Sequence, residues 1–315
     1  MSESSDYYRH HVLDDAPLFH LPWWLDAVCD NNWDVAIFKR EDQLVAYYIY
    51  ATHRNRFGFH LIMPELTQFL GPNYRLNATN IREINNEEME ILETLLSQLP
   101  KSASFESRWH FTFQNWLPFY WQGFRQCTRY TYVLEDISNP DSLRQNFSEK
   151  IQREISKAEK KFMLEESNDV IKFYQLLEKN FAGKKMKMPF QKSLVNKIFS
   201  AAQLNHAGKI FLAVDDLKKV AAGIFVVWDA TTAYYIIGGK DDDFGNSGAM
   251  SLLFWSAFNE LKDRVKSFDF EGSMLRGVEN YFRSFGAEQK GFFEITKINS
   301  PILKIRATVK SLLRK

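Results

Sequence analysis

Hydrophobic and polar positions follow two different periods along the chain, and these periods predict strands and helices. Runs with a period of two, rich in Val, Ile, Phe and Tyr, predict hairpins over residues 33–54 and 209–229. Apolar residues at helical spacing predict a long helix over residues 138–162 and a helix over 85–100 that Asn85 or Asn86 caps. The other predicted elements are helices over 17–31, 169–181, 190–205, 248–262 and 278–285, and strands over 57–64, 108–115, 129–137, 231–240, 266–272 and 291–298. This alternation predicts a protein of the α/β (α+β) class.

Two segments, residues 109–134 and 266–296, share one pattern. Each begins with an alternating aromatic strand, FTFQN or FDFEG, and continues with a short aromatic segment closed by glycine, PFYWQGF or NYFRSFGA. Each ends with a strand rich in aromatic or β-branched residues, and a hairpin, a further strand and a helix precede each copy. We interpret the chain as two copies of one fold, divided near residues 136–140.

The repeated unit resembles the GNAT acyltransferase fold, and its tandem arrangement resembles the Fem family of peptidoglycan-bridge aminoacyltransferases. The stretches that carry the resemblance are QGFRQCTRYTYVLEDI with LRQNFSEKIQREISKAEKK, YYIIGGK with the helix that follows it, and FDFEGS with YFRSFGAE. The resemblance implies two tandem GNAT-like domains, residues 1–137 and 138–298, each a mixed, mostly antiparallel sheet flanked by helices.

The last segment, residues 299–315, is basic and amphipathic. Ile302, Ile305, Val309 and Leu312 fall near one helical face, and five Lys or Arg residues occur from Lys304 onward. We expect the segment to pack back on the N-terminal domain, with contact to an anionic lipid surface as the alternative.

Composition limits the classes of partner. Of 315 residues, 45% are hydrophobic and 25% charged, which is ordinary for a globular protein of two domains. Forty basic and 39 acidic residues nearly cancel, so we expect no DNA partner and at most peripheral membrane contact. Two isolated cysteines, a polar N-terminus and no apolar run of about 20 residues lead us to expect a cytoplasmic protein. The histidines and cysteines lack a metal-ligand spacing, so no metal site is predicted.

The loop before the helix over 248–262 bears on the acyl donor. In GNAT enzymes that use coenzyme A, the corresponding loop holds pyrophosphate on backbone amides at a helix N-terminus. Here the loop is DDDFGNSGAM, in which Gly245 and Gly248 offer amides. The three residues Asp241 to Asp243 are expected to repel phosphates.

The short aromatic helix also departs from the GNAT pattern. The resemblance implies a tyrosine general acid at a position that is Phe282 here, with Tyr281 one residue earlier. Neighbouring helical residues point about 100° apart, so Tyr281 is not an easy substitute. Both departures suit the Fem-like branch, which takes its acyl group from charged tRNA. We therefore expect no tightly bound cofactor and leave acyl-CoA and aminoacyl-tRNA open as donor substrates.

A basic arc on the helix over 138–162 is a candidate phosphate site. Lys150, Arg153, Lys157 and Lys161 fall within about 80° of one another at 100° per residue. Arginine can bind two phosphate oxygens as a fork. The alternative is a solvated face, in which Glu154 neutralises Lys150.

Two carboxylates at the end of the predicted strand 266–272 are candidates for proton transfer. Asp269 and Glu271 share one face of this strand because side chains alternate. Either carboxylate is placed to accept a proton from an attacking amine. The alternative is that one caps the next helix while the other pairs with Arg276 or Arg283, and these two arginines are also candidate substrate ligands.

The strand over 231–240 ends in a further candidate. Lys240 follows Gly238 and Gly239, and the resemblance implies that this strand diverges from its neighbour and opens the acyl-donor cleft. A lysine there is placed to stabilise an oxyanion or to meet a phosphate. Tyr235 either lines this cleft or packs in the sheet.

We therefore predict an acyl- or aminoacyltransferase that moves an acyl group from a thioester or aminoacyl ester to an amine or hydroxyl. The expected acceptor is a cell-envelope or nucleotide-linked, phosphate-bearing molecule such as a glycan precursor, with charged tRNA as a possible partner. Arg153 and Lys157 would hold phosphate, Lys240 the oxyanion, and Glu271 would assist proton transfer. The alternative is a non-catalytic GNAT-fold protein that binds a glycan or nucleotide-sugar precursor.

Overall fold

The structure is a computed structural model that describes residues 2–272 and 274–312, with side chains except those of 307, 308 and 310–312. Some residues named in the predictions above lie outside this description: Ser273, Arg314, Lys315 and the side chain of Leu312.

The chain forms two compact units whose limits differ from those expected. The first unit contains the residues up to Arg129 and those from Gly291 onward, and the second contains Tyr130–Lys290. Strand β6 (Arg125–Leu134) starts in the first unit and ends in the second. Strand β12 (Glu288–Ile298) starts in the second unit and ends in the first. For this reason neither residue 137 nor residue 298 separates the units.

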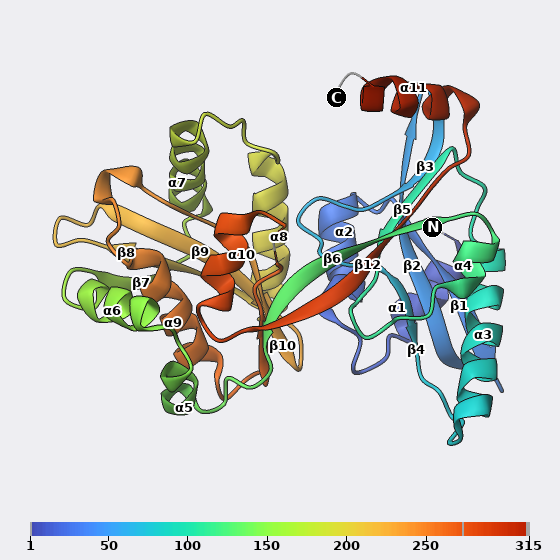
Figure 1. Cartoon of the computed structure of the whole chain (residues 1–315), viewed down its shortest axis with the longest axis horizontal. Coiled ribbons are helices and arrows are strands. Elements are labelled where there is room, and N and C mark those ends of the chain that lie inside the picture. The colour runs from blue at the N-terminus through green and yellow to red at the C-terminus, as the bar shows by residue number, and fades with distance from the viewer. Residues whose placement is uncertain (1, 273, 313–315) are drawn as a thin grey trace. The chain divides into compact units, whose positions relative to one another are not determined.

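The first unit is a mixed sheet with helices (Figure 1). Its strand order is β1-β2-β3-β5-β12, in which only the β3–β5 pair is parallel, and β4 pairs with β2. The predicted hairpin over 33–54 is confirmed as β1 and β2. The bounds are β1 Trp33–Arg40, β2 Gln43–Asn55, β3 Gly58–Ile62, β4 Gly71–Tyr74, β5 Ser104–Arg108, α1 Glu3–His10, η1 Leu18–His20, α2 Pro22–Cys29, α3 Ile81–Gln98, α4 Leu117–Trp121 and α11 Pro301–Leu312.

The second unit repeats this topology with one further edge strand. Its strand order is β6-β11-β10-β9-β8-β7, in which only the β10–β11 pair is parallel. The bounds are β7 Met163–Ser167, β8 Gly208–Val214, β9 Val220–Trp228, β10 Thr232–Lys240, β11 Ser267–Asp269, α5 Pro140–Gln145, α6 Glu149–Ala158, α7 Val170–Gly183, α8 Lys192–Leu204, η2 Asp242–Phe244, α9 Ala249–Leu261 and α10 Arg276–Arg283. The predicted α/β (α+β) class and the element-level repeat are therefore confirmed.

The two copies exchange their last strands. The strand that follows α4 is β6, and it pairs with β11 of the second copy. The strand that follows α10 is β12, and it pairs with β5 of the first copy. The alternating patterns of β6 and β12 suit either position, so only the tertiary structure selects the partner.

Two boundaries predicted in the first unit are wrong. The strand of the first copy is β5, whereas FTFQN at 111–115 lies outside any strand and begins in a turn closed by Phe113 N–H to His110 C=O. Helix α3 begins at Ile81, because the side chain of Asn80 accepts from Glu83 N–H at 3.0 Å. The start of this helix is exposed, including Ile81 at 72%, so no buried apolar stripe marked its first turn.

The predicted helix over 138–162 is broken between α5 and α6. Phe147 lies in the break, only 3% exposed, with its ring against Trp255, Phe258 and Phe285. Ser148 restarts the helix as its N-cap. The free energy gained by burying the Phe147 ring thus outweighs that of a continuous helix through this segment.

Helix α11 is only partly packed. It is attached to the first unit, where Asn299 and Ser300 donate to the backbone carbonyl of Ala103 and the Arg306 guanidinium lies 4.6 Å from the Phe57 ring centroid. Ile302 and Ile305 are nevertheless 60% and 65% exposed. The expected packing therefore leaves these apolar side chains uncovered by the described residues.

An ion pair ties β12 to β5 and β6, and its effect on stability is testable. Burial alone would raise the pKa of Glu294, but Arg129 at 2.6 Å and Arg108 at 3.1 Å hold this pKa below its usual range. A lowered folded-state pKa stabilises the fold above the unfolded pKa, and this stabilisation is lost as pH falls. We expect Glu294→Gln to reduce the free energy of unfolding by about 1–2 kcal/mol at pH 7. Urea unfolding should show the difference shrinking below about pH 4. A loss that does not change between pH 7 and pH 3 would contradict this assignment.

Candidate functional site

A pocket of about 320 Å³ lies in the second unit at the N-terminus of α9. The end of β10, the loop over 245–248, the first turn of α9 and one face each of α6 and α10 line it. Its charged lining residues are Lys150, Glu154 and Lys240. The pocket therefore combines two cations and a carboxylate with the open amide end of a helix, which suits a ligand that carries negative charge.

Gly248 sets the close approach of α6 to this helix terminus. Its φ is +80°, a left-handed conformation that favours glycine. A Cβ atom at this position would overlap the backbone carbonyl oxygen of Glu154 and lie 2.8 Å from its carbonyl carbon. The glycine thus lets Glu154 reach the first turn of α9.

The acidic residues of the loop do not line this pocket. Asp241 is buried and accepts from Lys179 at 2.7 Å. Hydrogen bonds from Lys179 at 2.6 Å and Lys219 at 3.3 Å lower the pKa of Asp243. These lysines offset the charges of Asp241 and Asp243, which reduces the repulsion of phosphate that the sequence suggested.

A chain of three side chains leads from the pocket to a carboxylate. The Ser251 hydroxyl donates to Glu154 Oε2 at 2.6 Å, and Tyr281 Oη lies 2.9 Å from Ser251 Oγ. The single hydroxyl proton of Ser251 is used by Glu154, so Tyr281 donates to Ser251 and keeps its own oxygen lone pairs as acceptors. Burial raises the pKa of Tyr281, which keeps the phenol protonated at neutral pH. This geometry can pass a proton from the pocket to Glu154.

Tyr281, rather than Phe282, lies at the pocket. Phe282 is 4% exposed and stacks on Phe270 with a centroid distance of 4.8 Å, so it belongs to the core. Tyr281 lines the pocket. The two side chains point about 100° apart on α10, and the sequence alone did not show which of these faces meets the pocket. The Ser251 and Glu154 partners were missed because they come from separate elements.

The basic arc of α6 divides between pocket and solvent. Lys150 lines the pocket, and Lys157 Nζ donates to the backbone carbonyl of Asn246 in the loop at 3.4 Å. Arg153 is 78% exposed and contacts Glu149 on its own helix. Lys240 lines the pocket at the end of β10. Of the residues predicted to hold phosphate, Lys150 therefore lines the pocket, whereas Arg153 and Lys157 are not among its lining residues.

Neither Asp269, the last residue of β11, nor Glu271 is among the residues that line the pocket. Asp269 is 1% exposed and accepts hydrogen bonds from the Thr131 hydroxyl and, at 2.7 Å, from Glu271 N–H. It does not cap α10, whose N-cap is Leu275 without a side-chain hydrogen bond. Glu271 has a φ of +56°, a costly conformation for a residue with a side chain. Its charge contributes, after burial, to the raised pKa of Tyr235.

Tyr235, Arg276 and Arg283 are not among the pocket-lining residues either. The Tyr235 ring packs against Phe254 at a centroid distance of 4.9 Å. Arg283 pairs with Glu279 at 2.9 Å, and Arg276 is exposed near the start of α10.

Strand β10 parts from β11 close to this site. Their parallel pairing covers Thr232 to Tyr234 on β10 and ends at Asp269, whereas β10 continues to Lys240 at the pocket. The backbone N–H and C=O groups of β10 after Tyr234 therefore do not pair with β11. The pairing of β10 with β11 thus ends before β10 reaches the pocket.

Within residues 2–272 and 274–312, no helix is long and apolar enough to cross a membrane, and no group of three or more His, Cys, Asp or Glu is arranged to hold a metal ion.

Comparisons with known proteins indicate the same fold. Residues 144–283 match the family model described as acetyltransferase (GNAT) domain, and this stretch contains the whole pocket lining except Ser284. No curated protein matches the chain. Among solved structures, FemX aligns with a TM-score of 0.67 at 12% identity, covering 92% of this chain and 94% of FemX.

Two other solved structures are also similar. The C-terminal domain (DUF2156) of an assigned lysylphosphatidylglycerol synthetase from Agrobacterium fabrum has a TM-score of 0.57 at 12% identity, covering 97% of this chain and 95% of that one. A tandem GNAT protein from the clavulanic acid biosynthesis pathway has a TM-score of 0.50 at 9% identity, covering 87% and 93%. At these identities the likeness shows the fold. Residues 144–283 thus match a GNAT acetyltransferase domain, and the chain has the fold of the Fem-like and tandem GNAT structures.

Proposed function

We propose that the pocket at the N-terminus of α9 binds an acyl-CoA donor and that the second unit transfers its acyl group to an amine or hydroxyl. The observation that carries this proposal is the joint position of Lys150, Lys240 and the Tyr281–Ser251–Glu154 chain in one pocket. The amides at the start of α9 and the two lysines suit a pyrophosphate, and the loop residues Asp241 and Asp243 are offset by other lysines.

The proposed reaction begins with attack of an amine on the thioester carbonyl carbon. As the C–N bond forms, the proton of the amine passes to Tyr281 Oη, the proton of Tyr281 to Ser251 and the proton of Ser251 to Glu154. The C–S bond then breaks and coenzyme A leaves as a thiolate. Glu154 releases its proton to solvent water, which protonates the thiolate and restores the carboxylate. Lys240 stabilises the oxyanion or the phosphates.

Glu271 is retained as the second candidate base. It follows β11 at the point where β10 and β11 separate, and its left-handed backbone suits a positioned side chain. Asp269 supports the turn through its bond to Glu271 N–H. Comparison of Glu154→Gln with Glu271→Gln tests which carboxylate receives the proton.

For the acceptor we propose an amine or hydroxyl on a cell-envelope or nucleotide-linked molecule. The support is the fold likeness to FemX and to a protein described as a lysylphosphatidylglycerol synthetase, whose name contains an aminoacylated lipid. The same likeness makes aminoacyl-tRNA the alternative donor.

Donor binding separates these possibilities. We expect coenzyme A to raise the Tm of the wild-type protein and the Kd for coenzyme A to rise about tenfold in Lys240→Ala, because a phosphate contact is lost. Arg153→Ala is the matched control, since this exposed side chain contacts its own helix, and its Kd should change less than about twofold.

Three outcomes count against the proposal. If coenzyme A binds equally weakly to Lys240→Ala and to Arg153→Ala, the phosphates lie on the exposed face of α6. No response to coenzyme A, together with label transfer from aminoacyl-tRNA, would replace the donor. No transfer from either donor to any amine or hydroxyl acceptor tested would overturn the proposed function.

A further inference from the structure

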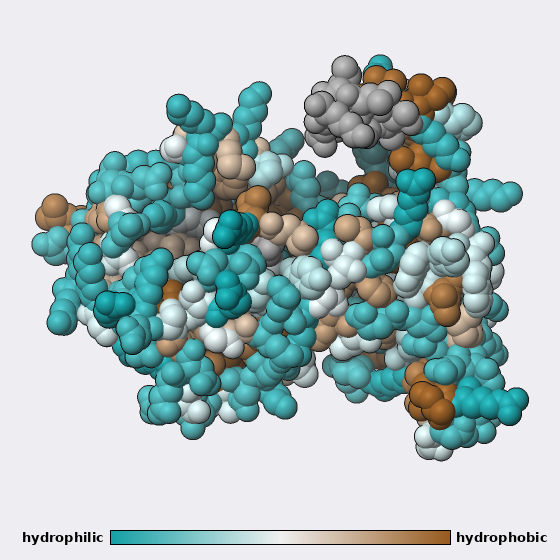
Figure 2. All heavy atoms as spheres, in the orientation of Figure 1, coloured by the Kyte–Doolittle hydropathy of each residue, from teal (hydrophilic) through white to brown (hydrophobic). Residues whose placement is uncertain are grey.

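Helix α11 of the first unit turns its apolar stripe outward. Ile302, Ile305 and Val309 are 60%, 65% and 49% exposed, whereas Leu303 is half-buried. At 100° per residue the three exposed side chains fall within about 60° of one another. Figure 2 shows hydrophobic atoms gathered over the visible part of α11. A surface helix ordinarily packs its apolar side against the core, but no described residue buries this stripe.

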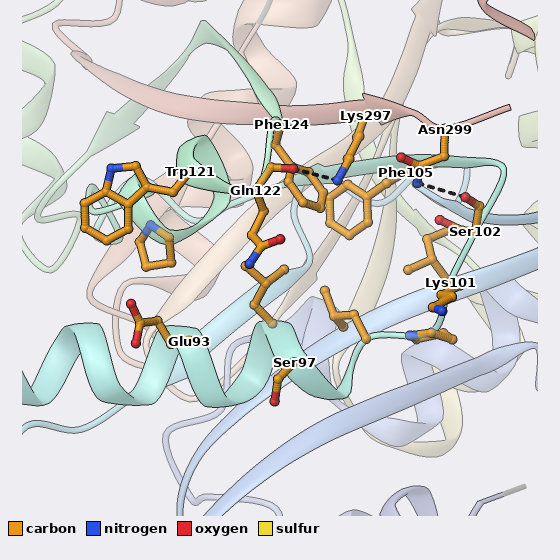
Figure 3. A pocket seen from close by; sticks show the side chains of 15 residues that line it. Glu93, Ser97, Lys101, Ser102, Phe105, Trp121, Gln122, Phe124, Lys297 and Asn299 are labelled. Carbon is orange, nitrogen blue, oxygen red and sulfur yellow. Dashed lines mark hydrogen bonds between the residues drawn. The ribbon is translucent and has the colours of Figure 1, made fainter. Parts of the chain in front are cut away.

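Hydrogen bonds fix the connection that leads into α11. Backbone N–H groups of Asn299 and Ser300 donate to the carbonyl of Ala103 at 2.9 and 3.1 Å. The side-chain amide of Asn299 donates to the carbonyl of Ser102 at 2.9 Å, at one end of the pocket drawn in Figure 3. Ala103 N–H in turn donates to the carbonyl of Phe59 in β3 at 2.7 Å. The start of α11 is therefore attached beside the hairpin of β2 and β3.

Basic side chains of α11 and of this hairpin lie together. The guanidinium groups of Arg56 and Arg306 lie 4.7 and 4.6 Å from the ring centroid of Phe57, which is in the turn between β2 and β3. Arg54, near the end of β2, is also exposed, and we call Arg54, Arg56 and Arg306 the basic cluster. Segments 51–64 and 295–315 contain no Asp or Glu, so no carboxylate of these segments offsets the positive charge.

Basic residues border the apolar stripe of α11 on both sides. In helical projection Arg306 falls about 40° from Ile302 on one side, and Lys304 falls about 100° from Ile305 on the other. Amphipathic helices with this arrangement lie in a membrane interface, with apolar side chains among the acyl chains and basic side chains near the lipid phosphates. A single-stranded nucleic acid fits less well, because its bases stack on aromatic rings whereas this stripe is aliphatic.

We propose that α11 and the turn between β2 and β3 bind the first unit peripherally to an anionic phospholipid membrane. The stripe of Ile302, Ile305 and Val309 enters the interface, and the basic cluster lies at the lipid phosphates. A soluble anion would use the basic cluster alone, whereas a membrane uses the cluster and the stripe together. This inference does not rest on the proposed transfer reaction, because none of these residues lines the pocket at α9.

The test is sedimentation of the full chain with lipid vesicles. We expect it to bind mixed vesicles of phosphatidylglycerol and phosphatidylcholine, and to bind pure phosphatidylcholine vesicles at least tenfold more weakly. Ile302→Asp with Ile305→Asp should weaken binding to the mixed vesicles at least tenfold, because charged side chains replace those that insert. Arg56→Glu with Arg306→Glu should also weaken it at least tenfold, because attraction to the phosphates becomes repulsion. All four side chains are exposed, so both variants should fold, which circular dichroism checks.

Two matched controls come from exposed positions of the second unit. Leu204→Asp with Leu217→Asp replaces aliphatic side chains that are 82% and 84% exposed. Lys160→Glu with Lys187→Glu makes the same change of net charge as the arginine pair, and both lysines are exposed. Each control should keep vesicle binding within about twofold of the wild type.

Several results would overturn this membrane site. Equal binding to both vesicle types would do so, as would a loss in either control as large as that in its matched variant. If Ile302→Asp with Ile305→Asp binds the mixed vesicles like the wild type, the stripe does not insert. Binding of single-stranded RNA that Arg56→Glu with Arg306→Glu abolishes, without any vesicle binding, would assign the surface to nucleic acid instead.

Discussion

Replacing Tyr281 with phenylalanine is expected to lower kcat about a hundredfold, the usual contribution of a positioned proton-transfer group. The change removes one oxygen and keeps the ring that packs 5.3 Å from Phe285 and 6.2 Å from Phe254. The proton path to Glu154 is then cut at its first member, while the pocket keeps its shape. Steady-state kinetics with an acyl-CoA and a responsive amine acceptor measures the effect.

Glu154→Gln should cause a loss of similar size, and the double variant should lose little more, because members of one relay are not additive. Two exposed residues provide the matched controls, Tyr130→Phe and Glu149→Gln. If Tyr281→Phe keeps kcat within about twofold while Glu271→Gln loses it, the relay is wrong and Glu271 is the base.

Gly248→Ala is expected to remove donor binding and to reduce the free energy of unfolding by about 3 kcal/mol. The methyl group must adopt a φ of +80° and would overlap the backbone of Glu154, which cannot rotate away as a side chain can. Relief requires α6 and α9 to separate, and the Ser251–Glu154 hydrogen bond would be lost with that movement. Urea unfolding and titration with coenzyme A measure the two effects.

Gly277→Ala is the control for this substitution. Gly277 also lines the pocket, but it lies inside α10, and a Cβ there meets nothing within 4 Å. We expect this variant to be as stable as the wild type or up to about 1 kcal/mol more stable, because alanine favours the helix. If Gly248→Ala unfolds no more easily than Gly277→Ala, the close packing of α6 on the start of α9 does not limit stability.

The sequence by itself determined most of the element types and the repeat. The alternation of β1 and β2, the helical stripe of α9 and the order of elements in each copy are local patterns, because each depends on residues a few positions apart. The same patterns carried the resemblance to GNAT and Fem proteins and brought Lys150 and Lys240 forward as candidates, both of which line the pocket.

Only the tertiary structure decided which partner each of these elements meets. The exchange of β6 and β12 leaves no mark in their own sequences, because an alternating strand pairs equally well with either neighbour. Tyr281 and Phe282 changed roles because the core, through Phe270, fixed the rotation of α10. Ser251 and Glu154 are 97 positions apart in the chain, so their hydrogen bond exists only after α6 and α9 have packed around Gly248.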